Sequence, residues 1–515
     1  MTNLTRSNVE PVRVFGTEEA IDNLGRLKVS RHQNIFEADF EYGLQPLRWE
    51  TLTNGAGSAV THQPGEGGVL MRLGATANAY TIRQTRPYHR YQPGKSMFMA
   101  SAVLFGPART GQRQRVGFYD DSNGVFFEQG DPTVTNPSGM GVVLRSDAGG
   151  VVTNTRIEQP NWTSNLTDFG GIDWNAIQMI WMEFAWYGAG LLRWGIFVDG
   201  IPYTLHSLGR GNKGGVTRVW ARTGNLPVRY EQLNITAQST TNDMYHYGVS
   251  VIVEGGIDDQ RGFTYAYGTP WNATSANAGR RSVVAGAGTA GNRIPLVSIR
   301  GRTMGTQEAG NTSGVTLNTG AITAGTTTSL TVTGTPMTAG AYVGRFCAYV
   351  NTGVTYMARI TANTSSVLTL ADPIVGGAMD AAPVAGQNYT IGMVNRGQLL
   401  PRRLQIISDR AVLVELLVST PSSPVVLTGA TFTALGGSSF ALIDSAATAA
   451  TGGEIVYSIF VPANNPVDQA IDNLFPLVTN LRGTATDIMS VLVTNTDTTN
   501  AALVSVQIIG QEAMS

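Results

Sequence analysis

Hydrophobic and polar positions alternate along much of the chain in short runs, which is the pattern of half-buried β-strands. The clearest runs are residues 177–186, 191–198 and 201–206, which are joined by Gly188-Ala-Gly190 and by Asp199-Gly200. An Asp-Gly pair between two such runs is a specific hairpin signal, because both residues tolerate positive φ. This stretch therefore predicts an antiparallel meander of three strands.

The same alternation recurs between residues 33 and 262, in runs that are separated by Gly, Asn and Asp. We expect further strands at 68–73, 96–104, 116–119, 124–128, 141–145, 217–221 and 247–253. More than eight short strands with regular turns are typical of an antiparallel sandwich or jelly roll. The sequence thus predicts an all-β fold.

The second half of the chain shows β patterning of its own. Strands are expected at 296–300, 404–407, 411–418, 454–461, 488–493 and 502–509, and only residues 466–474 favour a helix. The run at 296–300 could pair with the later strands, so residues 308–394 between them would be an insertion. Between Asn311 and Val394 this segment has only four charged residues, which favours a small β-module that buries its faces against neighbours.

Composition suggests where the parts begin and end. All eight tryptophans lie between Trp49 and Trp271, and a stretch of small residues at 265–295 is typical of a linker. We therefore expect the following parts: an N-terminal arm (1–32), a β-sandwich (33–265), a linker (266–295), a C-terminal β-sandwich (296–307 and 395–515) and a small inserted β-domain (308–394).

Charge and composition exclude several classes of partner. Charged residues make up 14% of the 515 residues and the formal net charge is −1, whereas nucleic acids and anionic membranes call for a basic stripe. We expect no nucleic-acid partner and, without a long apolar run, no membrane span. Cys347 is the single cysteine, so no intrachain disulfide forms. The first residues lack the pattern of a secretory signal.

Three motifs invite a functional interpretation. Gly286-Ala-Gly288-Thr-Ala-Gly291 matches a dinucleotide fingerprint, but no helix pattern follows it. The pairs Asp120-Asp121 and Asp258-Asp259 could be calcium ligands or paired carboxylates. Asp120-Asp121 stands between two strand-like runs, where a hairpin turn explains Asp, Asn and Gly more simply.

Other residues give no catalytic pattern. The five histidines, at positions 32, 62, 89, 206 and 246, never occur at metal-ligand spacing, and Cys347 lies within a strand-like run. We therefore expect no catalytic residue, no metal and no cofactor. Two carboxylates that are distant in the chain could still form a glycosidase pair, although nothing in the sequence favours one.

Aromatic and basic clusters remain as possible surfaces. Alternation places the aromatic residues around Trp181 in a core first, and a sugar-stacking or subunit surface is the alternative. This cluster comprises Trp181, Phe184, Trp186, Trp194 and Phe197. The only local basic cluster, formed by Arg83, Arg86 and Arg90, is expected at a solvated or interfacial strand edge.

Several stretches are similar to one known family. They are 26–30 with 34–40 and 42–45, 117–120 with 123–128, 184–200, 225–231, 395–401, 427–431 and 451–453. Together they resemble large virion structural proteins of tailed bacteriophages, several of which carry a lectin-like, concanavalin-type sandwich. The resemblance implies such a sandwich at 33–265 and assembly into a virion, and it transfers no site residues. The insertion at 308–394 departs from the usual pattern of the family.

The expected function is accordingly structural. We expect a non-enzymatic component of a phage tail, neck, baseplate or capsid surface, of fibre or decoration type, which assembles in the host cytoplasm and resides in the virion. Its partners would be further copies of itself, with a trimer favoured, and other virion proteins. Binding of a host-surface glycan is the main alternative. A depolymerase is a third, but the repeats of a β-solenoid are missing.

Overall fold

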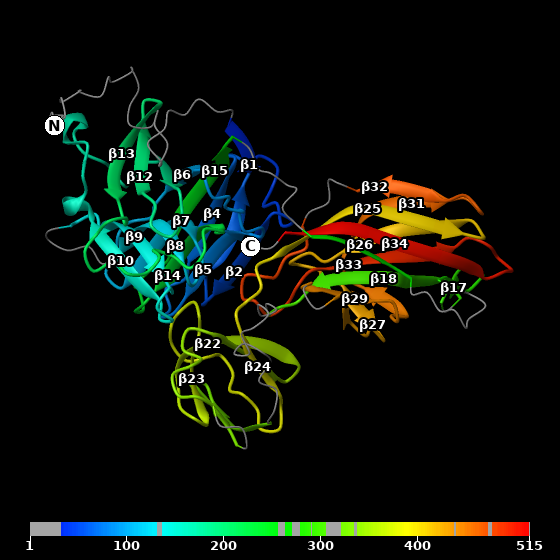
Figure 1. Ribbon diagram of the computed structural model, residues 1–515. Coiled ribbons are helices and arrows are strands. Elements are labelled where there is room, and N and C mark those ends of the chain that lie inside the picture. The colour runs from blue at the N-terminus through cyan, green and yellow to red at the C-terminus, as the bar shows by residue number, and fades with distance from the viewer. Residues whose placement is uncertain are drawn as a thin grey trace, which may run out of the picture.

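The computed structural model describes residues 32–130, 136–255, 263–269, 279–289, 291–304, 321–333, 337–436, 439–471 and 476–513. Within these ranges the regular structure is antiparallel β-sheet and two 3₁₀ turns, η2 (Gln159–Asn161) and η3 (Thr167–Phe169). The predicted all-β fold class is confirmed. No helix in the described ranges is long and apolar enough to cross a membrane. The strands gather into three groups, which Figure 1 shows side by side.

The first group is a sandwich of two sheets, hereafter the first sandwich. Its outer sheet has the order β13 (Ile201–Leu208), β12 (Leu192–Val198), β11 (Gln178–Phe184), β6 (Met97–Leu104), β15 (Asn242–Glu254), β4 (Gly68–Leu73), β3 (Ala59–Gln63), with β1 (His32–Ala38) paired to β15. Its inner sheet, which faces the rest of the chain, has the order β10 (Thr153–Glu158), β9 (Met140–Ser146), β8 (Gly124–Gly130), β7 (Gln112–Tyr119), β14 (Val228–Asn234), β5 (Tyr80–Thr85), β2 (Trp49–Asn54).

One apolar core fills the space between these two sheets. Trp194 of the outer sheet and Phe118 of the inner sheet are fully buried in it. The predicted meander is present as β11, β12 and β13, and Asp199 and Gly200 both have positive φ, at 52° and 80°. These angles fit a two-residue hairpin turn that matches the twist of its strands, which is why Asp-Gly was an informative signal.

The second group is another sandwich, hereafter the second sandwich. One sheet has the order β16 (Phe263–Gly268), β34 (Ala502–Ala513), β25 (Gln398–Ser408), β32 (Val467–Ala470), with β17 (Arg281–Val283) paired to β34. The facing sheet has the order β28 (Thr433–Ala434), β29 (Ala441–Asp444), β18 (Arg293–Gly301), β33 (Ile488–Asn495), β26 (Val412–Val418), β31 (Glu454–Val461). A small ribbon pairs β27 (Val426–Thr428) with β30 (Ala449–Thr451).

The described strands of the second sandwich correct the expected linker. Residues 263–268, 281–283 and 293–295 lie in strands rather than in a free connection, and 263–265 do not belong to the first sandwich. β16 and β17 both pair with β34, and Tyr265 packs into the second core. The twelve-residue strand β34 offers backbone groups along its whole edge, and these two strands satisfy them.

Two further expectations are wrong. Residues 467–470 form strand β32 instead of a helix, because they pair with β25 and Asp468 forms an ion pair with Arg403. Residues 217–221 form no strand. They run as a loop whose Trp220 is buried, with its indole N–H donating to the carbonyl of Trp186. Tertiary contacts override the local pattern in both places.

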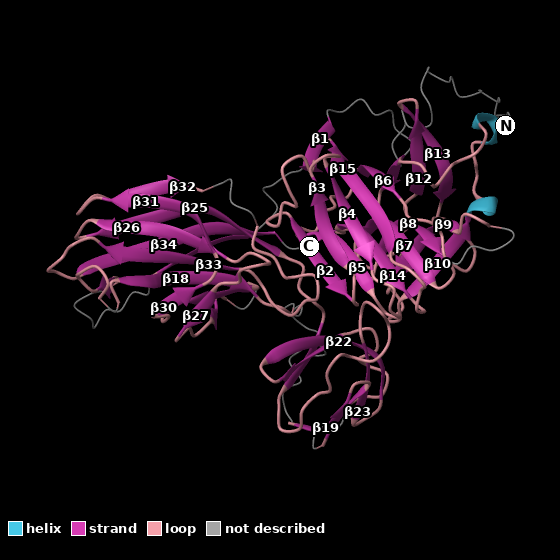
Figure 2. Ribbon diagram, turned by 180° about the vertical axis from the view of Figure 1, so that it is seen from behind, coloured by secondary structure: helices cyan, strands magenta, loops and turns pink. Residues whose placement is uncertain are grey.

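The third group, hereafter the inserted module, is one sheet with a core of its own. Its order is β19 (Ile322–Thr326), β20 (Ser329–Val332), β23 (Val367–Ala371), β22 (Val354–Asn363), β21 (Phe346–Asn351), β24 (Tyr389–Gly392). It lies between β18 and β25 in the sequence and below the two sandwiches in Figure 2. The expected arm, except His32, falls outside the described residues.

Candidate functional site

The most unusual surface of the first sandwich is the outward face of its inner sheet. Because neighbours on a strand point to opposite faces, β14 sends Val228 and Tyr230 into the core and sends Arg229 and Glu231 outward. Glu231 stands directly opposite Arg115 of β7. The sheet therefore carries charged side chains side by side on a face that an ordinary sandwich leaves to water.

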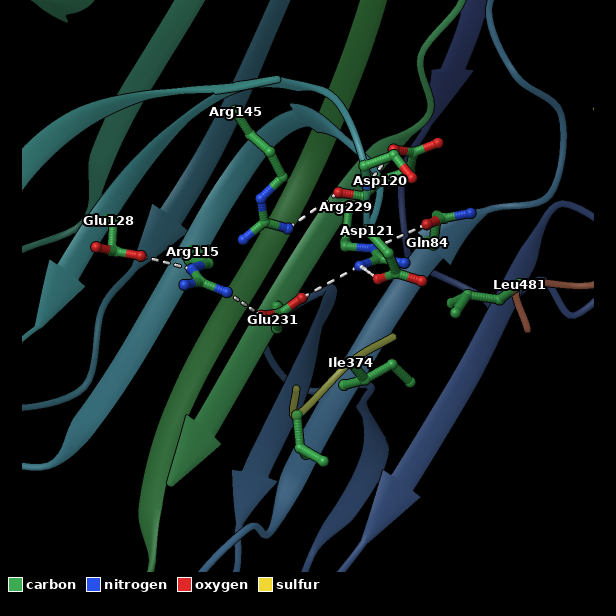
Figure 3. Close-up of polar contacts among 12 residues, drawn as sticks. Gln84, Arg115, Asp120, Asp121, Glu128, Arg145, Arg229, Glu231, Ile374 and Leu481 are labelled. Carbon is green, nitrogen blue, oxygen red and sulfur yellow. Dashed lines mark hydrogen bonds and ion pairs between the residues drawn. The ribbon is translucent and has the colours of Figure 1, made fainter. Parts of the chain in front are cut away.

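These side chains form a continuous row of ion pairs, which Figure 3 shows. Arg115 donates from Nε to Glu128 Oε2 at 2.6 Å and from Nη1 to Glu231 Oε1 at 2.7 Å. Arg229 Nη1 then donates to Glu231 Oε2 at 3.3 Å and to Asp121 Oδ1 at 2.5 Å. We call these five residues the charged row.

The charged row is buried although it lies outside the apolar core. Arg229 is 1% exposed and Glu231 is 2% exposed. Burial opposes ionisation of Glu128, but Arg115 and Arg156 outweigh it and lower the pKa of Glu128 to about 2. Likewise Arg229 overcomes burial and lowers the pKa of Asp121. These carboxylates are therefore ionised and held as acceptors at neutral pH.

Aromatic rings and a further arginine cover the row. Tyr119 and Phe126 are fully buried neighbours with ring centroids 4.4 Å apart. The guanidinium of Arg145 lies over both rings, 5.6 Å and 5.1 Å from their centroids, and donates to the carbonyl of Asp120. Burial lowers the pKa of Arg145 to about 10. The face is thus closed by its own side chains.

The second sandwich docks onto the neighbouring strands of the same sheet. Arg86, just after β5, forms a buried ion pair with Asp487, and the backbone N–H of Leu481 donates to Glu50 Oε2 at 2.7 Å. Leu481 also packs against an apolar patch at this end of the sheet. The patch is formed by Tyr80, Ile82 and Leu233, with Leu52, Ile374 and Val375 packed around it.

The inserted module closes the junction from below. Arg359 of β22 donates to Ser122 Oγ at 2.6 Å, within the turn between β7 and β8. A Cβ atom on Gly344 would lie only 1.9 Å from the carbonyl oxygen of Gly150, so the two turns meet backbone to backbone. Arg482 of the second sandwich joins both other parts, since it bonds to Asp372 at 3.2 Å and to Tyr80.

The acidic pair at 120–121 has a structural role. Asp120 Oδ1 accepts from the backbone N–H groups of Ser122 and Asn123, at 2.8 Å each, which fixes the turn between β7 and β8. Asp121 belongs to the charged row. Asp258 and Asp259 lie outside the described residues. Gly286 and Gly288 have positive φ in a turn that follows β17, not at the start of a helix.

The candidate ligands and nucleophile lie apart from one another. In the described ranges, no three His, Cys, Asp or Glu side chains are grouped so as to hold a metal. His246 stacks on Tyr230 at 4.1 Å inside the first core, and burial lowers the pKa of His89 to about 3. Cys347 is fully buried in the inserted module and burial raises its pKa, so its thiol is unreactive.

The aromatic cluster is divided by the structure. Phe184 and Trp194 lie in the core, and Trp181 is buried against Phe98. Trp186 is partly exposed at the junction. Two of the five members therefore lie in the core, Trp181 is buried outside it, and Trp186 and Phe197 are partly exposed.

The basic cluster lies elsewhere than expected. β5 is an internal strand between β14 and β2, so it offers no sheet edge. Arg83 is buried, with its guanidinium 5.0 Å from the ring centroid of Trp49. Arg86 makes the ion pair that joins the two sandwiches. A solvated position is therefore wrong for these two arginines, while the interfacial alternative is right for Arg86.

The charged row was not predicted from the sequence, although the sequences of β7 and β14 contain a signal for it. Arg113 and Arg115 alternate with other residues on β7, and Arg229 and Glu231 alternate on β14. Arginine and glutamate at every second position of two strands indicate a paired outer face. What the pattern cannot supply is the register that brings Glu231 opposite Arg115.

Comparisons with known proteins identify no family. No family model matches the chain, and no curated protein matches it. Solved structures do match parts of it. A glycosyl hydrolase family 16 protein from Mycobacterium smegmatis is 10% identical over 42% of this chain and 100% of that chain, with a TM-score of 0.30.

Two other solved structures give similar values. An immunostimulatory antigen and pseudo β-1,3-glucanase of Mycobacterium tuberculosis is 12% identical over 44% of this chain and 99% of its own, with a TM-score of 0.29. A Crh5 transglycosylase in complex with NAG is 16% identical over 43% of this chain and 84% of its own, with a TM-score of 0.27. Likeness at this level carries no functional argument, and the all-β assignment rests on the sheets themselves.

Proposed function

We propose that this chain is a structural component of a tailed-bacteriophage virion that acts through its shape, through self-association and through docking to other virion proteins. The main support for the proposal is the way in which the charged side chains are paired. The arginines and carboxylates of the charged row are paired with one another, and Arg86 at the end of the same sheet is paired with Asp487 of the second sandwich. Such a surface supports a rigid scaffold.

The state of the carboxylates supports a non-enzymatic role. A glycosidase needs one carboxyl group that holds a proton as general acid beside a second that stays ionised. Glu128 has a pKa of about 2, and Glu231 lies between Arg115 and Arg229. Glu128 therefore stays ionised at neutral pH while Arg115 and Arg156 remain in place, and both carboxylate oxygens of Glu231 accept hydrogen bonds from arginines.

The three-part construction also supports a scaffold. Polar contacts tie each part to the other two, through the buried Arg86 and Arg359 and the partly exposed Arg482. Contacts of this kind hold parts in one arrangement and cost stability when one partner is lost. A protein that transmits force or fixes positions within a particle needs parts that keep one arrangement.

Quantitative mass spectrometry of gradient-purified particles tests the proposal. The chain should occur in a fixed ratio to the major capsid protein, in several copies per particle. Its presence only in the non-particle fraction of the lysate would refute the proposal. Incubation of the purified chain with host polysaccharide, followed by a reducing-end assay, should release no new ends above a heat-treated control.

A further inference from the structure

A cavity of about 620 Å³ lies where the first sandwich, the inserted module and the second sandwich meet. Its size is within the range of small-molecule sites. The first sandwich contributes Trp186 and Asp120, the inserted module contributes Phe346, and the second sandwich contributes Phe440. The cavity therefore exists only when the three parts are docked.

Aromatic rings form one side of this cavity. Trp186 is partly exposed, and its ring meets that of Tyr91 edge to face, with centroids 6.1 Å apart. The indole N–H donates to the carbonyl of Ala221 at 2.9 Å, which fixes the ring plane. A Cβ on Gly224 would lie 2.9 Å from Trp186 and 3.0 Å from Tyr91, so glycine allows the backbone to pass close to both rings.

Acidic and amide groups line the other side. Asp120 accepts two backbone N–H groups on Oδ1 and the Tyr88 hydroxyl on Oδ2 at 3.2 Å, which uses three of the about four acceptor positions of a carboxylate. Asn225 and Asn395 also line the cavity. These groups are oriented by the protein and suit ligand hydroxyls, which both donate and accept.

The formal charges of the lining balance, since it holds two carboxylates, Asp120 and Asp121, and two guanidinium groups, Arg222 and Arg396. Asp121 is paired with Arg229 at 2.5 Å, and Arg222 is paired with Asp147 at 3.1 Å. Arg396 donates to the carbonyls of Asn480 and Leu481, at 2.7 Å and 2.8 Å. An ionic ligand would have to compete for these partners, whereas a neutral ligand leaves them undisturbed.

We infer that this junction cavity binds a neutral saccharide. A pyranose offers an apolar face for Trp186 and hydroxyl groups for Asp120 and the two asparagines, without a charge that the lining would have to compensate. The site does not depend on the chain being a virion protein. Because three parts of the chain build it, separate fragments should not bind.

The test uses the full chain and two unlike variants. Calorimetry and tryptophan fluorescence measure binding of glucose, galactose, mannose, N-acetylglucosamine and their disaccharides, with glucuronate and glucose 6-phosphate as anionic probes. Trp186→Ala removes the aromatic face, and Met393→Trp fills the cavity from another part of its wall. Tyr42→Ala, at a residue 88% exposed elsewhere, is the matched control.

At least one neutral sugar should bind saturably, with affinity at least tenfold lower in Trp186→Ala and Met393→Trp and unchanged in Tyr42→Ala. Should Trp186→Ala fail to fold, Met393→Trp decides. Three results would each overturn the inference: no binding of any neutral sugar, tighter binding of an anionic probe, or unchanged affinity in a folded cavity variant. Particle mass spectrometry is independent of all of them, so the two proposals fail separately.

Discussion

Arg86 and Asp487 are 401 positions apart in the sequence and form an ion pair whose side chains are 7% and 11% exposed. The pair lies between the inner sheet of the first sandwich and the second sandwich. Asp487 Oδ2 also accepts the backbone N–H of Val478 at 2.9 Å. One carboxylate therefore organises a loop and joins two parts of the chain.

Removal of one partner of this pair should loosen the junction. Arg86→Ala leaves a buried carboxylate unpaired, and such losses cost about 3–5 kcal/mol. Differential scanning calorimetry should show a lower midpoint and separation of the second sandwich as its own transition. Arg86→Met combined with Asp487→Leu should cost less than Arg86→Ala, because no buried charge is left alone. Equal costs for the two variants would show that the pair does not act through charge.

Two buried carboxylates should respond to pH in opposite directions. The pKa of Glu128 is lowered from 4.5 to about 2, so its stabilisation is complete above pH 4.5 and is lost as pH falls toward 2. Burial raises the pKa of Glu50 above 4.5, so its ionised form costs stability at neutral pH, and this cost disappears as pH falls through the raised pKa.

Glutamine variants separate these two contributions. Glu128→Gln should lose about 2–3 kcal/mol at pH 7 and flatten the decline of stability between pH 4.5 and 2. Glu50→Gln should be neutral or stabilising at pH 7, because the amide oxygen still accepts from Leu481. Thermal midpoints measured from pH 2 to 7 give both curves. If the two substitutions changed stability in the same direction at pH 7, the opposite pKa shifts assigned to Glu128 and Glu50 would be contradicted.

Gly195 of β12 should tolerate no side chain. A Cβ at this position would lie 2.2 Å from both the Trp181 ring and the carbonyl oxygen of Tyr203. Gly195→Ala must displace a buried tryptophan or a strand and should cost about 2 kcal/mol or more. Gly214→Ala is the control, since nothing lies within 4 Å of its Cβ. Equal thermal midpoints for the two variants would contradict the packing described here.

Self-association should use the edge of the second sandwich. Among the described strands β31 pairs only with β26, and its Ile455 and Phe460 are 50% and 56% exposed. An apolar edge strand of this kind favours pairing with another chain. Sedimentation should find a trimer for the wild type and a smaller species for Phe460→Lys. Val354→Lys, 53% exposed in the inserted module, should leave the trimer intact.

The sequence predicted strands better than it predicted their partners. The alternating pattern located β11, β12 and β13. The pair Asp199-Gly200 marked the turn between the last two strands, because both residues of that turn have positive φ. The sequence assigned residues 263–265 to the first sandwich and 266–268 to a linker, since only the long strand β34 decides where these residues pair. A helix was expected at 466–474 for the same reason, as the ion pair of Asp468 with Arg403 is a tertiary contact.

The candidate site was harder to predict than the fold. The acidic pair at 120–121 was recognised as a turn, but the pairing of Asp121 with Arg229 depends on residues 108 positions apart. The junction cavity joins residues as distant as Tyr88 and Phe440. Such sites depend on how the folded sandwiches and the inserted module dock, and no local sequence pattern encodes this docking.

Cryo-electron microscopy of the particle is the most direct test of the structural role. It should show repeated density in which the two sandwiches and the inserted module fit in one fixed arrangement, with the junction around Arg86 and Asp487 closed in every copy. Particles without density for the chain would contradict the structural role. Copies in which the three parts take different relative positions would contradict the rigid scaffold.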